Sequence, residues 1–339
     1  HSRLESAKIH YINATGVQVL TDFIGDLSDN THIEASTLIV GVGPQSDGAP
    51  AHNAILHLIE EYSATQVAEL DSDILFDMST ERPQVLLDES SQRKIEWPQA
   101  SFWYLAKESM GPRLRDPIPD VGNGNILFFT SPEPQFHWKR ISDEIIKITE
   151  RLEITTVILL SSFDGPVPYH HEAPILVTST AAESDSENPA HDLAHNIATR
   201  VSGNFTLPRY QGGATFTMAL GTLLRDAGLQ ITTINAIAPF YVQEHGSPHA
   251  IDGLIGAFDA LYGVETNRAE IKQEKEELEA RLEDARTNDS TFDTFITALE
   301  SQYVEWQENF VATKESELST EDIIADVEAL FEPEDTSNT

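Results

Sequence analysis

Leu38-Ile39-Val40-Gly41-Val42-Gly43 is a short apolar run of the kind that forms a buried strand. Residues 44–50 follow as a proline-bounded turn, and in residues 51–62 the apolar side chains recur at helical spacing. Further strand-like runs occupy residues 126–129, 157–160, 175–177 and 231–237, with helical segments at residues 141–152 and 214–227. This alternation predicts an α/β protein whose sheet of mainly parallel strands is flanked by helices.

Residues 82–99 interrupt the alternation. They contain two short strand-like pieces joined by the polar residues 88–93, which predicts an inserted β-hairpin. The insertion has too few apolar residues to be stable by itself. We therefore expect it to pack against another copy of the chain, with the nearby aromatic residues 102–104 contributing. The candidate interface residues of the hairpin are Val85, Leu87, Ile95 and Trp97.

From about residue 267 the sequence is helical in character, because Glu, Lys and Arg are closely spaced and no Gly or Pro occurs before Pro333. Residues 264–339 hold 22 acidic and 6 basic residues, so this part carries much of the negative charge. A weak apolar stripe is followed by a stronger apolar face between residues 292 and 310. We expect a helical appendage that packs on the α/β domain.

The composition excludes several functions. The 339 residues include 56 acidic and 21 basic ones, a net charge of −35 that disfavours nucleic-acid binding. An acidic surface also keeps a protein soluble in a salty cytoplasm, so the charge needs no cationic partner. There is no cysteine for disulfides or thiolate catalysis, and no run of the roughly 20 apolar residues that a membrane span needs. We expect a soluble, cytoplasmic protein.

A candidate ligand site follows from the order of the strands. Asp47 and Gly48 follow the first strand, Glu133 the second and His171 the third, and the carboxyl ends of parallel strands meet at one edge. A further pair, Arg209 and Tyr210, precedes two glycines and a helix, where guanidinium and amide groups together can hold an anion. We expect these residues to bind a polar ligand beneath the aromatic C-terminal face. The alternative is that they cap helices and form ion pairs.

Other motifs are incomplete. The glycines at 41, 43 and 48 fit neither the dinucleotide fingerprint nor the P-loop, so turn geometry explains them better. His191 and His195 have the spacing of two zinc ligands on a helix, but no third ligand is identifiable. No nucleophile elbow surrounds Ser161 or Ser162. The sequence therefore shows no catalytic constellation, and we expect neither a metal nor another cofactor.

The order of several short motifs resembles the PAC2 (proteasome assembly chaperone 2-like) family, specifically its long actinobacterial branch, over roughly residues 15–332. Two departures are Ser131 in place of the usual Gly, and Glu172-Ala173 where the family has Thr-Arg. The chain given also ends without the hydrophobic-Tyr-x tail by which some relatives engage the proteasome. The motifs are Gln45 to Ala51, Glu81-Arg82-Pro83, Ile95-Glu96-Trp97-Pro98, Pro132-Glu133-Pro134 with Trp138, Val167-Pro168 before His171, and Pro208-Arg209-Tyr210-Gln211-Gly212.

The resemblance implies a core like that of purine nucleoside phosphorylases, a hairpin used in oligomerisation, often as a trimer, and a C-terminal helical lid over a ligand site. We expect a non-enzymatic, oligomeric binding or assembly-chaperone-like protein. The alternative is an enzyme that acts on a small polar, nucleoside-like metabolite under the lid. The expected organisation is a tag remnant and tail at 1–14, a core at 15–264, an acidic helical domain at 265–332 and a disordered tail at 333–339.

Overall fold

The computed structural model describes residues 33–43, 49–121, 124–179, 189–206, 211–245 and 247–312. The expected tag remnant and the expected disordered tail lie outside these residues. The strands are β1 (Thr37–Gly43), β2 (Thr65–Leu70), β3 (Gln84–Leu87), β4 (Arg93–Glu96), β5 (Ala100–Leu105), β6 (Ile126–Pro132), β7 (Thr156–Gly165), β8 (Ile175–Ser179), β9 (Asn204–Thr206) and β10 (Gln230–Pro239). The α-helices are α2 (Pro50–Glu61), α3 (Ser72–Leu75), α4 (Trp138–Arg151), α5 (Pro189–Arg200), α6 (Phe216–Asp226), α7 (Pro248–Tyr262), α8 (Ala269–Asn288) and α9 (Ser290–Ala312), and the short 3-10 helices are η3 (Lys107–Met110), η4 (Pro119–Val121) and η5 (Phe240–His245).

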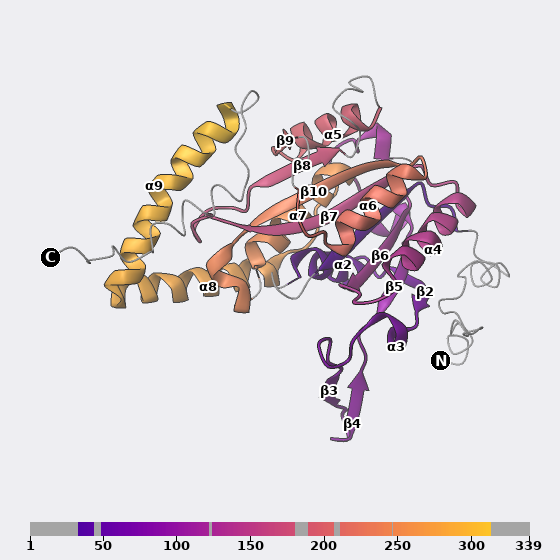
Figure 1. Cartoon of the computed structure of the whole chain (residues 1–339), viewed down its shortest axis with the longest axis horizontal. Helices are drawn as coiled ribbons and strands as arrows, with labels where there is room; N and C mark the ends of the chain where they lie inside the picture. Colours follow the sequence, from indigo (N-terminus) through magenta and orange to yellow (C-terminus); the bar gives the residue numbers. More distant parts are fainter. Residues whose placement is uncertain are drawn as a thin grey trace.

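In the described part of the chain, eight strands form one mixed sheet in the order β2-β5-β6-β1-β7-β10-β8-β9 (Figure 1). Its centre, β6-β1-β7-β10, is parallel. The strand β5 pairs antiparallel with both β2 and β6, and β8 pairs antiparallel with β10. The predicted sheet of mainly parallel strands with flanking helices is confirmed.

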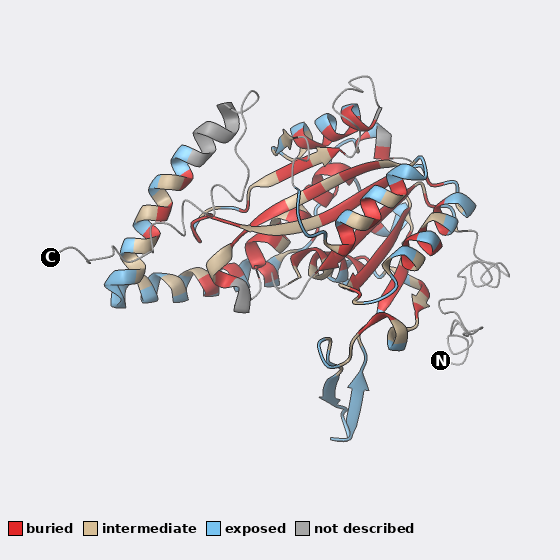
Figure 2. Cartoon of the chain, viewed as in Figure 1, coloured by how far each residue is buried: buried red, intermediate tan, exposed pale blue. Residues whose placement is uncertain are grey.

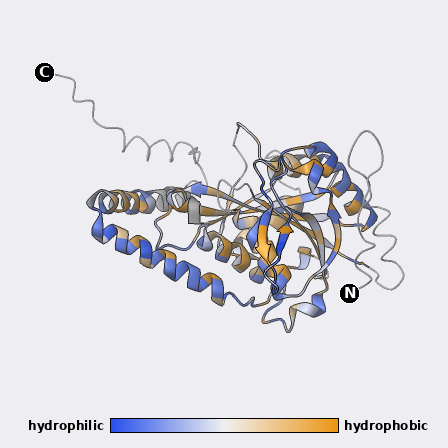
Figure 3. Cartoon of the chain, turned by 90° about the horizontal axis from the view of Figure 1, so that it is seen from below, coloured by the Kyte–Doolittle hydropathy of each residue, from blue (hydrophilic) through white to orange (hydrophobic). Residues whose placement is uncertain are grey.

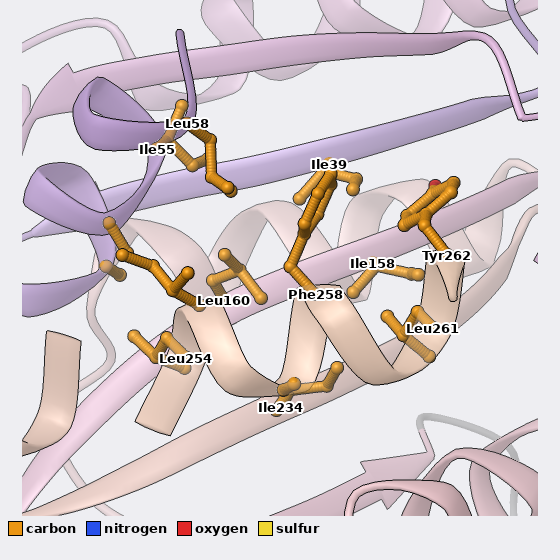
Figure 4. Packing of buried hydrophobic residues seen from close by; sticks show 14 of the residues in the cluster. Ile39, Ile55, Leu58, Ile158, Leu160, Ile234, Leu254, Phe258, Leu261 and Tyr262 are labelled. Carbon is orange, nitrogen blue, oxygen red and sulfur yellow. The ribbon is translucent and has the colours of Figure 1, made fainter. Parts of the chain in front are cut away.

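Helices cover both faces of this sheet, so that its strands are buried between two layers (Figure 2). One apolar cluster joins α2, α5 and α7 to one face, and it includes Ile39, Leu160 and Phe258. Figure 4 shows side chains of α2 and α7 meeting those of β1, β7 and β10 in this cluster. A second cluster joins α4 and α6 to the other face through Val40 and Leu159. Successive residues of β1 and β7 thus enter opposite clusters, because side chains alternate along a strand.

The inserted hairpin is present as β3 and β4, which pair antiparallel in a sheet of their own. The aromatic residues 102–104 that follow the hairpin do not all lie at the surface, as an interface would require. Phe102 is 1% exposed and its ring lies 4.6 Å from that of Phe129 in the core. Trp103 and Tyr104 are half-buried in β5. The expectation that residues 102–104 anchor an interface is wrong for Phe102, because β5 joins the main sheet.

The C-terminal helices α8 and α9 form a pair at one end of the molecule (Figure 1). The surface of α8 is strongly hydrophilic (Figure 3), with Ile271, Lys275 and Leu278 as its buried residues. In α9 the buried side chains include Ile296 and Leu299. No helix in the described residues is long and apolar enough to cross a membrane. The predicted C-terminal helices are therefore confirmed, and the stronger apolar face belongs to α9.

Two glycines allow α2 to lie directly on the end of β1. A Cβ on Gly41 would lie 2.4 Å from the carbonyl oxygen of Ala51, and one on Gly43 would lie 2.5 Å from the Cβ of Ala49. Real Cβ atoms do not approach so closely. Gly41 and Gly43 lie within the C-terminal half of β1 and serve helix-to-strand packing, whereas Gly48 is outside the described residues.

We predict that Gly41→Ala destabilises the fold by about 1–3 kcal/mol, because the new methyl group meets backbone that cannot move away. The midpoint of urea denaturation measures this loss. Gly213→Ala is the matched control, since a Cβ there has nothing within 4 Å. Equal midpoints for the two variants would show that the close contact between β1 and α2 does not require a glycine at position 41.

Candidate functional site

Glu133 lies at the carboxyl end of β6 and joins two elements. Its N–H donates a hydrogen bond to the carbonyl oxygen of Gly43, 3.1 Å away. Its Oε1 accepts a hydrogen bond of 2.6 Å from the N–H of Phe216, the first residue of α6. A carboxylate at a helix N-terminus is stabilised by the free N–H groups and the helix dipole. The contacts of Glu133 fit the capping role that the sequence left open.

The predicted residues Asp47, Gly48, Arg209 and Tyr210 lie outside the described residues. That these four meet Glu133 and His171 in one ligand site stays a prediction. The structure places Gly43, the last described residue before Asp47, beside Pro132 at the carboxyl edge of the sheet. Gly43 therefore lies next to the residue that precedes Glu133.

His171 lies farther out, because β7 and β10 run past the end of β1. The last pair between β1 and β7 is Gly41 with Leu160, whereas β7 and β10 stay paired as far as Gly165 and Pro239. We call residues 161–165 and 235–239 the strand extension and residues 166–174 the tip loop. By this register Gly165 lies three residues beyond the level of Gly43, or about 10 Å at the rise of a strand.

The described contacts therefore do not bring Glu133 and His171 together. Glu133 contacts β1 and α6, whereas His171 contacts α9, where its ring centroid lies 4.7 Å from that of Tyr303. The aromatic face of α9 covers the tip loop and the strand extension, through contacts that include Val167 and Ile237. The C-terminal helices thus cover one of the predicted site residues.

The tip loop is bound to both C-terminal helices. The hydroxyl of Tyr169 donates a hydrogen bond to the carboxylate of Glu283 in α8. His170 Nε2 lies 3.8 Å from Oε1 of Glu300 in α9. Together with the ring contact of His171, these contacts attach α8 and α9 to the tip loop. Sequence reasoning identified the histidines but not their partners, which lie more than a hundred residues away.

A network of charges continues from this loop, in which Lys275, Asp252 and Asp259 are buried and Glu172 is exposed. Lys275 of α8 bonds Glu172 at 2.6 Å and Asp252 of α7 at 3.0 Å, and Arg268 bonds Asp252 at 2.8 Å and lies 3.7 Å from Asp259. Burial acts to lower the pKa of Lys275, but its bonds with Glu172 and Asp252 outweigh burial and raise that pKa. Burial raises the pKa of Asp259, against the bonds it accepts. Buried charges need such partners, so this network positions α8 on α7.

His52, in the first turn of α2, is a titratable group that the sequence did not reveal. Its Nδ1 lies 2.7 Å from Oγ1 of Thr130, and that hydroxyl donates its proton to the carbonyl oxygen of Gly41 at 2.9 Å. Nδ1 of His52 must therefore carry the proton of the neutral ring. Burial lowers the pKa of His52 to about 4. The ring ties α2 to β6 as a neutral donor.

Metal binding finds no support in the described residues. No group of three or more His, Asp and Glu side chains there is placed to hold a metal ion. The pair His191 and His195 lies against Phe205, whose ring centroid is 3.9 Å from that of His195. These two histidines pack around an aromatic side chain of β9.

Of the ten exposed large apolar residues in the described part of the chain, five lie in the hairpin or directly after it. Val85 is 58% exposed and Leu87 is 68% exposed, and the register pairs Val85 with Ile95. Paired residues of an antiparallel hairpin point to the same face, and Trp97 continues the alternation after β4. We call Val85, Leu87, Ile95 and Trp97 the hairpin face. The opposite face carries the pairs Gln84 with Glu96 and Leu86 with Lys94.

These features define a class of protein: an α/β core with a parallel centre, a protruding hairpin and a C-terminal helical pair. The sequence model of the PAC2 family matches residues 43–286. The chain belongs to the PAC2 family. A comparison with curated proteins finds no match.

Solved structures share the fold. A protein of unknown function from Mycobacterium tuberculosis is 17% identical, with a TM-score of 0.66 over 89% of this chain and 94% of its own. A proteasome-assembly chaperone homologue from the same organism is 19% identical, with a TM-score of 0.55 over 73% and 94%. An archaeal proteasome activator from Pyrococcus furiosus is 16% identical, with a TM-score of 0.54 over 76% and 96%.

We predict that His52 makes stability depend on pH. Its pKa in the folded chain is about 4, below the ordinary 6.5, so protonation favours the unfolded chain. The contribution is fully present above about pH 6.5 and is lost as the pH falls towards 4, a change of roughly 3 kcal/mol. Urea denaturation between pH 7.5 and 4.5 measures this slope.

His52→Asn keeps a donor near Thr130 but does not titrate, so its slope should be shallower than that of the wild type. His57→Asn is the control on the same helix, because His57 is half-buried and bonds the carbonyl oxygen of Asn267 rather than a side chain of the sheet. It should keep the wild-type slope. Identical slopes for all three proteins would remove His52 as the cause.

Proposed function

We propose that this chain is an oligomeric, non-enzymatic protein that binds protein partners in the manner of an assembly chaperone and acts in the cytoplasm. Its membership of the PAC2 family supports this role. The same fold occurs in a protein described as a proteasome-assembly chaperone homologue and in one described as an archaeal proteasome activator. Both descriptions concern the binding of other proteins.

The observation that carries the proposal is the exposed hairpin face. Its side chains are between 43% and 68% exposed, although Val85, Leu87, Ile95 and Trp97 are all apolar. A two-stranded hairpin with this much exposed apolar surface gains stability when a second surface covers it. We propose that another copy of the chain supplies that surface, as a homotrimer, which is the assembly that the family resemblance implies.

The polar candidates give less support to an enzyme. The described bonds of Glu133 cap a helix, and those of His170, His171 and Glu172 hold the C-terminal helices. The polar groups of these side chains contact other parts of the protein, whereas a catalytic group would have to be free to contact a substrate. The binding of a protein partner is therefore the role that we propose.

We predict that the double variant Val85→Asp, Leu87→Asp lowers the mass of the particle in solution. Two carboxylates in an apolar contact carry a desolvation cost that prevents assembly. Light scattering of the full chain should change from a multiple of 37.6 kDa to the mass of one chain.

Leu86→Asp is the matched control, because Leu86 lies on the opposite face of the same strand beside Lys94. It should leave the mass unchanged. A wild-type protein of 37.6 kDa, or a double variant with the wild-type mass, would contradict the oligomer.

Partner binding needs a separate measurement. A thermal-shift screen with nucleosides and polar metabolites should leave the melting temperature unchanged, whereas proteasome core subunits added to the full chain should form a complex in light scattering. A metabolite that raises the melting temperature, with no complex formed, would favour the enzyme instead.

A further inference from the structure

The helix α9 is attached to the body through small contact clusters of its own, whereas α8 also enters the large cluster on one face of the sheet through Ile271. In α9, Ile296 and Leu299 pack with Tyr169, Phe240 and Tyr241, apart from the two large clusters that cover the sheet. A second small cluster joins Tyr303 to the strand extension. Few buried apolar contacts allow a segment to open locally at less cost than global unfolding.

His249 is a buried titratable group beneath α8. It is 1% exposed in the first turn of α7, and its Nε2 lies 2.8 Å from Oε1 of Glu279. An ionised carboxylate only accepts, so Nε2 carries the proton of the neutral ring. Its Nδ1 is buried with no hydrogen-bond partner among the described residues. A second proton on His249 would therefore enter a site with no acceptor for it.

Charges of both signs face this ring. Glu279 and Lys275 approach it from α8, Glu172 from the tip loop, and Asp252 bonds Lys275 from α7 itself. Burial is the main cause that lowers the pKa of His249, and the charge of Lys275 lowers it further. The bond with Glu279 and the charges of Glu279 and Glu172 raise it, but the net shift is downward.

His171 lies half-buried beneath α9. Its ring packs on that of Tyr303, and the ring centroid of His170 in the tip loop lies 4.6 Å from it. The carboxylate that faces it is Glu300 of α9, which also bonds Arg286 of α8 at 2.8 Å. Burial and the neighbouring His170 lower the pKa of His171, against the charge of Glu300.

We propose that the α8–α9 pair is a pH-sensitive cover of the strand extension, docked while His249 and His171 are neutral and released when they bind protons. In the docked state, α8 contacts the neutral ring of His249 and α9 contacts the neutral ring of His171. The docked state is favoured above about pH 6.5 and weakens as the pH falls below it, since protons bind more tightly to the released state. This regulation goes beyond the proposed function and does not depend on the hairpin.

Release would uncover an aromatic surface. Tyr169, Phe240 and Tyr241 lie beneath α9, with ring centroids of Phe240 and Tyr241 at 5.9 Å and 5.4 Å from that of Phe295. The polar bonds of Tyr169 and Glu172 with α8 would be lost with it. The cover therefore controls access to the carboxyl end of β7 and β10.

Hydrogen exchange of the full chain at pH 7.5 and pH 5.5 tests the cover. This window spans the ordinary pKa of His and lies above those of Asp and Glu. After correction for intrinsic exchange rates, we expect protection of residues 269–305 to fall at least tenfold relative to residues 157–160 of the core. That ratio separates local release from global loss of stability. Equal protection at both pH values would overturn the proposal.

Two variants assign the effect. His249→Gln with His171→Gln removes both titrating rings, and the tenfold fall should shrink to less than threefold. The control His195→Gln, on α5 against Phe205, should behave as the wild type. A double variant that keeps the full tenfold fall would overturn the role of these histidines.

A titration of the wild-type imidazole signals by NMR decides the case even if the double variant fails to dock. The pKa of His249 should lie below 6.5, and its midpoint should coincide with the loss of protection in α8 and α9. A pKa of 6.5 or above, or a midpoint that differs from that of the loss of protection, would overturn the proposal.

Discussion

The strand β1 is buried along its whole length, from Thr37 to Gly43, and the rest of the architecture follows from that burial. Its peptide groups must find partners inside the protein, and the ladders to β6 and β7 supply them on either side. Its side chains alternate between two apolar clusters, so both faces need a layer of helices. The glycines near its end let α2 lie against the backbone.

The strand extension sets a second requirement. Where β7 and β10 continue past β1, Ala236 and Ala238 still pack in the large cluster on one face, whereas Ile237 on the other face needs another cover. The helix α9 supplies apolar contacts, and α8 adds Lys275, whose charge is shared by Glu172 and Asp252. In a chain with net charge −35, this buried cation joins acidic groups that would otherwise repel each other.

The hairpin and the C-terminal helices thus differ in the kind of surface that they expose. The hairpin exposes an apolar face on a strand pair that the body does not cover, whereas the C-terminal helices cover most of their apolar residues and expose hydrophilic ones (Figures 2 and 3). The first arrangement suits a lasting contact with another protein surface. The second suits a cover whose docking responds to charge, because its polar bonds depend on the protonation of their members.

The local pattern of the sequence was sufficient to predict the strands at residues 38–43 and 157–160, the hairpin and the C-terminal helices. These elements depend on hydrophobic period and turn residues, which lie within a few positions of one another. The pattern could not place Phe102, whose aromatic ring suits an interface and a core equally well. It also could not pair His52 with Thr130, or the tip loop with α8 and α9. Only the tertiary structure brings these distant residues together, because side-chain contacts depend on strand order and helix packing rather than on spacing along the chain.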